Sequence, residues 1–259
     1  MAVLSYTKGM NLDEAATAIL NTGVMMLKDG SEVFRVEDTM NRMGRTFPGI
    51  TNCTAYVTLT GVMVSISTKD QSLTKIARVH SIGHNLERIA ALNQLSRDCA
   101  AEHESPDQIM ARLSAISREP VWGSKIQIVG GALGALGFGI FFGCNFIECV
   151  LIFCAALLVQ ALGWWLDKYG ANSYLEVLLQ TLLASYILVT LNRLLFGLHM
   201  DAMLLSVLML LVPGMTLTSA IRDILTGNYV SGNARLAQAL LIGIFIALGA
   251  AIVLYGAIA

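Results

Sequence analysis

The charged residues of this chain are distributed very unevenly. Of its 35 Asp, Glu, Lys and Arg residues, 25 lie in residues 1–120 and only ten in residues 121–259. The second part contains five stretches with no charged residue, namely 126–147, 149–166, 177–192, 202–221 and 236–259. Because about 20 apolar residues in a helix cross the roughly 30 Å core of a bilayer, this pattern predicts an all-α membrane domain of five transmembrane helices.

The first 120 residues have the pattern of a soluble α+β domain. Asn11 followed by Glu14 is typical of a helix start, and runs rich in Thr, Val and Ile separated by Thr60-Gly61 indicate a β-hairpin. The expected elements are helices over 12–28 and 31–46, strands over 52–59, 62–68 and 74–80, and a helical connector over 85–103 that continues in a helix from Pro106. The predicted domains are therefore 1–120 and 121–259.

Composition restricts the chemistry of the chain. A net charge of −1 without a basic stripe gives no reason to expect nucleic-acid binding. Five scattered cysteines with no CxxC pair indicate neither a zinc site nor a disulfide framework. His80 and His84 do not form a convincing metal pair, and Gly30-Ser31-Glu32 lacks the pattern of a serine nucleophile. We therefore expect no cofactor, no metal and no catalytic residue.

Basic residues near the helix ends indicate the orientation in the membrane. Residues 1–8 do not have the pattern of a signal peptide, which favours a cytoplasmic first domain. With that orientation, four of the five basic residues of the second part lie inside and Arg193 lies outside. The four inside residues are Lys125, Lys168, Arg222 and Arg235. The chain is thus expected in the bacterial inner membrane, with its C-terminus in the periplasm.

The fourth predicted helix, residues 203–225, contains the sequence Val212-Pro213-Gly214 near its middle. Proline removes a backbone donor and interrupts a helix, and a helix that restarts within the membrane points its N-terminal amides inward. This combination suits a carboxylate, and a simple proline kink is the alternative. The predicted substrate-binding residues are Pro213, Gly214, Thr216, Thr218 and Ser219.

Other polar residues are candidates for transport roles. Glu176 and Gln180 share one helix face and form a candidate pathway, although Glu176 also lies near enough to a helix end for an interfacial position. Arg222 and Asp223 are predicted to gate the pathway or to form an ion pair. Arg35 and Glu37 are predicted to act by docking or gating.

Three motifs together resemble the threonine/serine exporter family. They are the segment Gly30-Ser31-Glu32-Val33-Phe34-Arg35-Val36-Glu37, then Val212-Pro213-Gly214, then Arg222-Asp223 followed by Gly227. The resemblance covers nearly the whole chain, but classical members are longer. The chain is therefore similar to the larger subunit of the split, two-component form, which in enteric bacteria is associated with succinate export.

The resemblance implies an inner-membrane exporter of small carboxylate metabolites, either a succinate-type dicarboxylate or threonine and serine. It also implies a small membrane partner of about four or five helices, the number an opposing half would supply. A homo-oligomer is the alternative assembly. Two other functions remain open from the residues alone, namely a membrane-anchored sensor or regulatory protein and a membrane-bound hydrolase.

Overall fold

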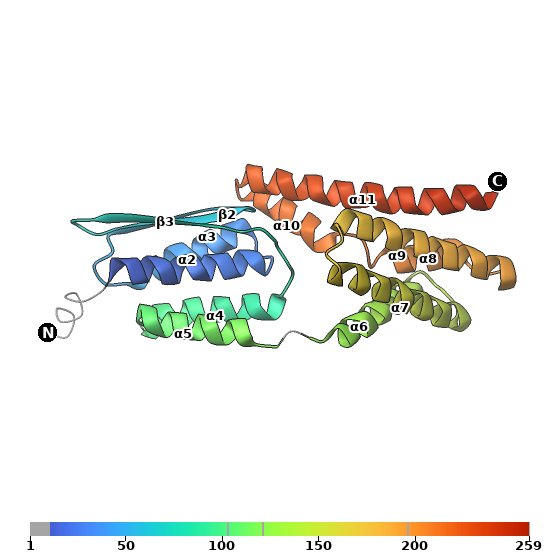
Figure 1. Ribbon diagram of the computed structural model, residues 1–259, viewed down its shortest axis with the longest axis horizontal. Coiled ribbons are helices and arrows are strands. Elements are labelled where there is room, and N and C mark those ends of the chain that lie inside the picture. Colours follow the sequence, from blue (N-terminus) through green and yellow to red (C-terminus); the bar gives the residue numbers. More distant parts are fainter. Residues whose placement is uncertain (1–10, 103, 121, 196, 259) are drawn as a thin grey trace. The chain divides into compact units, whose positions relative to one another are not determined.

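The computed structural model describes residues 11–102, 104–120, 122–195 and 197–258. The chain forms two compact units (Figure 1). The first unit contains Met1–Pro120 together with Thr218–Arg235, and the second contains Val121–Leu217 together with Leu236–Ala259. The sequence-based division placed residues 218–235 in the second domain, 121–259, whereas their contacts place them in the first unit.

The first unit has three layers (Figure 1). A sheet packs on one pair of helices, and a second pair of helices packs on the other side of the first pair. Its helices are α2 (Leu12–Lys28), α3 (Val33–Thr46), α4 (Leu86–Glu102) and α5 (Pro106–Arg118), and its strands are β1 (Asn52–Thr58), β2 (Gly61–Ser67) and β3 (Ser72–Arg78). Helices α2 and α3 form the middle layer and are packed between the sheet and the pair α4–α5. The predicted hairpin and third strand are confirmed.

The sheet is antiparallel in the order β1-β2-β3. Val57 pairs with Val62 and Ala55 pairs with Val64, and alternation along β1 and β2 buries these side chains against α2 and α3. Burial of this apolar face, at about 25 cal/mol per Å², is the main favourable contribution to folding of the unit.

Strand β1 is an edge strand, and α3 supplies partners for its outward amides. The N–H of Val57 donates to Glu37 Oε1 at 2.9 Å, and the N–H of Ala55 donates to Asn41 Oδ1 at 2.9 Å. Free edge amides invite pairing with other chains. Glu37 and Asn41, one turn apart on α3, therefore fix α3 to the edge of the sheet.

The second unit is helical. Its helices are α6 (Ser124–Phe141), α7 (Phe146–Lys168), α8 (Ser173–Leu195), α9 (Met200–Leu208), the first residues of α10 (Gly214–Leu225) and most of α11 (Tyr229–Ile258). Helix α9 packs against α6, α7 and α8, and its Met203 and Val207 are fully buried or nearly so. Helix α11 lies along α8, where the rings of Tyr174 and Phe245 stack 5.7 Å apart.

Among the described residues, four helices are long and apolar enough to cross a membrane, namely α6, α7, α8 and α11. The sequence predicted five. The fourth predicted helix is instead two short helices of 9 and 12 residues. The difference arises at residues 209–213, where Pro213 lacks the N–H that would continue the helix.

Candidate functional site

The predicted break in the chain is present between α9 and α10. Helix α9 ends at Leu208 and α10 begins at Gly214. Thr216 is buried, whereas Thr218 is exposed and Ser219 is half-buried. Thr216 and Ser219 are three residues apart and share a helix face. The structure therefore does not bring all three predicted hydroxyls to one surface.

The start of α9 is fixed by a buried carboxylate from α7. Glu148 is fully buried and forms a capping box with Asn145 at the start of α7. Its Oε1 accepts the N–H of His199 at 2.7 Å and lies 3.1 Å from His199 Nδ1. One side chain thus holds the N-termini of two helices together, so Glu148 has a structural role.

A polar cavity of about 370 Å³ lies among α6, α7 and α8. It is lined by Ser124, Gln127, Ile128, Gln160, Gly163, Trp164, Asp167 and Glu176. Two glycines make room for amide side chains in the cavity and next to it. A Cβ on Gly131 would lie 2.3 Å from Gln160 Nε2, and a Cβ on Gly163 would lie 2.1 Å from Gln180 Nε2. The small residues of α6 and α7 therefore accommodate polar side chains within an apolar unit.

Helix α8 continues this polar surface into the interior of the second unit. Gln180, Thr181 and Ser185 are buried, and Gln180 Nε2 donates to the carbonyl of Val159 at 3.1 Å. The hydroxyls of Thr181 and Ser185 have no hydrogen-bond partner within the described residues. Glu176 and Gln180 were predicted from the sequence. The sequence analysis did not single out Thr181 and Ser185, because single hydroxyls in an apolar helix form no pattern. Their closeness to Gln180 in the same helix could have indicated them.

A buried ion pair lies where α10 and α11 join the first unit. Asp223 is fully buried and Arg235 is 3% exposed. Their atoms Oδ2 and Nε are 3.2 Å apart, a contact without the alignment of a hydrogen bond. The predicted partner of Asp223 was Arg222, but Arg222 binds Glu32 at 2.6 Å instead.

Both members of the pair also bind the turn between α2 and α3. Asp223 Oδ1 accepts the N–H of Val33 at 3.1 Å, and Arg235 Nη2 donates to the carbonyl of Ser31 at 2.9 Å. The N-cap residue Glu32 makes no side-chain capping bond. Asp223 therefore caps α3 from a distant part of the chain, where a carboxylate also interacts favourably with the helix dipole.

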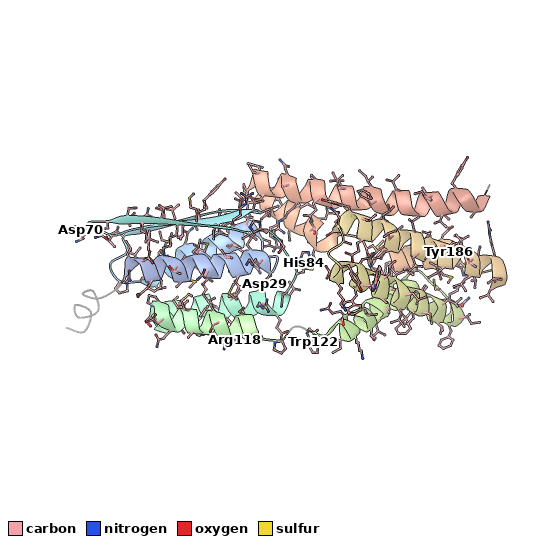
Figure 2. The ribbon with its side chains drawn as sticks, viewed as in Figure 1. Asp29, Asp70, His84, Arg118, Trp122 and Tyr186 are labelled. Carbon is pink, nitrogen blue, oxygen red and sulfur yellow. The ribbon has the colours of Figure 1, made fainter. Side chains whose placement is uncertain are left out.

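The α2–α3 turn is further held by residues 83–85. The N–H of Gly83 donates to the carbonyl of Lys28 at 2.7 Å, and the N–H of Asn85 donates to that of Asp29 at 2.9 Å. This places His84 near Asp29 (Figure 2). Gly30 has a φ of +94°, and a Cβ there would lie 2.5 Å from the carbonyl oxygen of Gly83. Only glycine fits this turn.

The two residues predicted to dock or gate lie in different surroundings. Arg35 is exposed, and Glu37 is half-buried at the sheet edge. Burial raises the pKa of Glu37, and the N–H of Val57 opposes that rise. Burial likewise raises the pKa of Asp223, opposed by the charge of Arg235. Among the described residues, no group of three or more His, Cys, Asp or Glu side chains is placed to hold a metal.

These features define a class of protein, a multi-pass membrane protein with a fused α+β unit and polar groups buried between its apolar helices. Residues 17–256 match the family model described as putative threonine/serine exporter. The chain belongs to this family.

The chain is also 26% identical over 235 residues to the probable threonine/serine exporter of Mycobacterium tuberculosis (strain ATCC 25618 / H37Rv). The match covers 90% of this chain and 44% of that relative, so the chain spans less than half of the relative's length. No solved structure matches the chain. The family model and this relative are both described as threonine/serine exporters.

Proposed function

We propose that this protein is part of an inner-membrane exporter of a small metabolite that carries a carboxylate. Threonine and serine are the first candidates because the matched family and relative bear those substrates in their names, and a succinate-type dicarboxylate is the second. The observation that carries the proposal is the polar cavity among α6, α7 and α8 with the buried polar residues of α8 beside it. An apolar helical unit that served only as an anchor would have no need of them.

The division of the chain supports five membrane crossings. Residues 1–120 and 218–235 belong to one compact unit and therefore lie on one side of the membrane. The chain between them contains three helices that can span, α6, α7 and α8. An odd number of crossings would separate the two parts, so we infer a fourth crossing within residues 199–217. If helical throughout, that segment would span about 28 Å, close to the thickness of a bilayer core.

The fourth crossing then contains the break at Pro213. Unpaired backbone groups at membrane depth are tolerated where they face protein or a polar cavity. The start of α10, with Gly214 and Thr216, would provide amides and a hydroxyl to a substrate carboxylate. Helix α11 would give the fifth crossing and put the two termini on opposite sides of the membrane. The basic residues at the helix ends favour a cytoplasmic N-terminus.

A second polypeptide would complete the pathway. Five crossings would form one half of a pseudosymmetric carrier, for which a small membrane partner or a second copy of this chain would supply the opposing half. The chain spans only 44% of its relative, which is consistent with a missing half.

The test is uptake of labelled threonine, serine or succinate into inside-out vesicles, in which transport out of the cell is measured as uptake into the lumen. The double variant Pro213→Ala/Gly214→Leu restores a continuous helix and should abolish export while the protein remains in the membrane. Gln180→Leu should also lower export, because it removes a buried amide beside the cavity. The matched control is Gln238→Leu, because Gln238 is exposed on α11.

Each substrate is assayed with and without a co-expressed partner. Full export by the Pro213/Gly214 double variant would exclude the broken helix as the substrate site. Export by the purified chain without a second polypeptide would favour the homo-oligomer. Equal loss of export in the Gln180 and Gln238 variants would remove the cavity from the pathway.

A further inference from the structure

A second polar cavity lies in the first unit, between α3 and α4, and has a volume of about 440 Å³. It is lined by Arg35, Asp38, Thr39 and Arg42 from α3 and by Ala90, Asn93, Ser96 and Arg97 from α4. Asp38 and Thr39 each lie three or four residues from Arg35 and from Arg42, so the four residues of α3 share one helix face. This volume is within the range of small-molecule sites.

The cavity carries an excess of positive charge. Its lining contains three arginines and one carboxylate, Asp38, which pairs with Arg42 at 2.9 Å. Counting charges gives 3 − 1 = +2 for the lining. Two arginines therefore face the cavity without a carboxylate of the lining to neutralise them.

The contacts of Arg35 and Arg97 leave their charges available. Arg97 binds the neutral side-chain carbonyl of Gln94 at 2.6 Å. Arg35 lies 3.9 Å from Glu32, but that carboxylate makes a much closer pair with Arg222 at 2.6 Å. The side chain of Arg35 is 47% exposed, so it can reorient toward a ligand.

The floor of the cavity adds uncharged polar groups. Thr39 and Ser96 are buried, and Asn93 is half-buried. A guanidinium group binds a carboxylate or phosphate through two parallel N–H bonds. An anion held by Arg35 and Arg97 would find hydroxyl and amide groups below it.

We propose that this cavity binds a small soluble dianion, a dicarboxylate or a phosphate. The charge of the lining matches two negative charges, and the opening to solvent suits a freely exchanging metabolite. The site lies wholly in the first unit and does not depend on the export function. It gives Arg35 a role as a ligand-binding residue, in place of docking on a membrane helix.

The test is calorimetric titration of the full chain in detergent micelles with inorganic phosphate, with succinate and with threonine. The double variant Arg35→Ala/Arg97→Ala removes both unneutralised charges, and the matched control Arg45→Ala removes an exposed arginine of α3 that does not line the cavity. We expect phosphate or succinate to bind, and at least about tenfold weaker binding in the double variant, the loss expected for one charge-assisted hydrogen bond. The control should bind as the wild type does.

The comparison of ligands identifies the source of the dianion. Binding of succinate alone indicates a dicarboxylate, and binding of phosphate alone indicates a phosphorylated metabolite. Absence of binding by either anion in the folded wild type would overturn the proposal. Unchanged binding in the double variant, or equally strong binding of zwitterionic threonine, would also overturn it. Circular dichroism of each variant verifies that the fold is retained.

Discussion

Both units bury polar groups, but two sets of these groups differ in whether they have partners. In the first unit, Asp223 and Arg235 pair with each other and with the backbone of the α2–α3 turn. In the second unit, the hydroxyls of Thr181 and Ser185 are buried without a hydrogen-bond partner in the described structure. The first arrangement links α10 and α11 to the α2–α3 turn, whereas the hydroxyls of the second contribute no hydrogen bond to the fold.

The largest expected effect is on the buried ion pair. Asp223→Ala leaves the Arg235 charge buried and unpaired and removes the cap of α3, and we expect a loss of about 3–5 kcal/mol in the stability of the first unit. Hydrogen–deuterium exchange at the first turn of α3 measures the change. The double variant Asp223→Ala/Arg235→Met should recover part of the loss, because no charge then remains buried.

The control for this variant is Arg222→Ala. Arg222 binds Glu32, but its side chain is 59% exposed, so its loss should cost less than about 1 kcal/mol. Equal effects of Asp223→Ala and Arg222→Ala would show that burial of the pair does not matter.

A medium effect is expected at the edge of the sheet. Glu37→Ala leaves the N–H of Val57 without its acceptor and should destabilise the first unit by about 1–3 kcal/mol. Glu37→Gln retains an acceptor and should be close to wild type. Exchange of the Val57 amide distinguishes these results. If Glu37→Ala lowers export without faster exchange at Val57, Glu37 acts in gating, as the sequence predicted.

The buried hydroxyls of α8 should behave in the opposite way. Thr181→Val retains the shape of the side chain, which packs on Gly249, and should change stability by less than about 0.5 kcal/mol. Export should nevertheless fall about fivefold, if one hydrogen bond of about 1 kcal/mol to the substrate is lost. Ser185→Ala tests the second hydroxyl in the same assay. A stability loss as large as that of Asp223→Ala would show that the two sites do not differ in kind.

The smallest expected effect is a pH dependence within the first unit. Arg112 joins α4 to α5 by binding Asp98 at 2.6 Å, and hydrogen bonds from Arg112 and Gln94 lower the pKa of Asp98. A carboxylate with a lowered pKa stabilises the folded state above its ordinary pKa of 3.8, and this contribution is lost as the pH falls through the lowered value. Thermal unfolding of Asp98→Asn should therefore depend less on pH in the acid range than that of the wild type.

Much of the local structure could be predicted from residue patterns. The helix from Leu12 to Lys28 and the three strands were expected because their apolar periodicities and turn residues agree. The break at Pro213 was expected because proline cannot continue a helix. The unwound segment 209–213 was not expected at this length, because hydropathy averages over these residues and does not register their backbone conformation.

What the sequence by itself determined is the division into a charged α+β part and an apolar helical part, since burial and bilayer thickness act on composition directly. Only the tertiary structure decided that Asp223 pairs with Arg235 and caps α3, 190 residues away in the chain. Only the tertiary structure showed that Arg35 and Arg97 line one cavity. It also showed that a glycine of α6 contacts an amide of α7, and that a glycine of α7 contacts an amide of α8. Such contacts depend on how separate helices pack, and the spacing of residues within one helix carries no information about its partner.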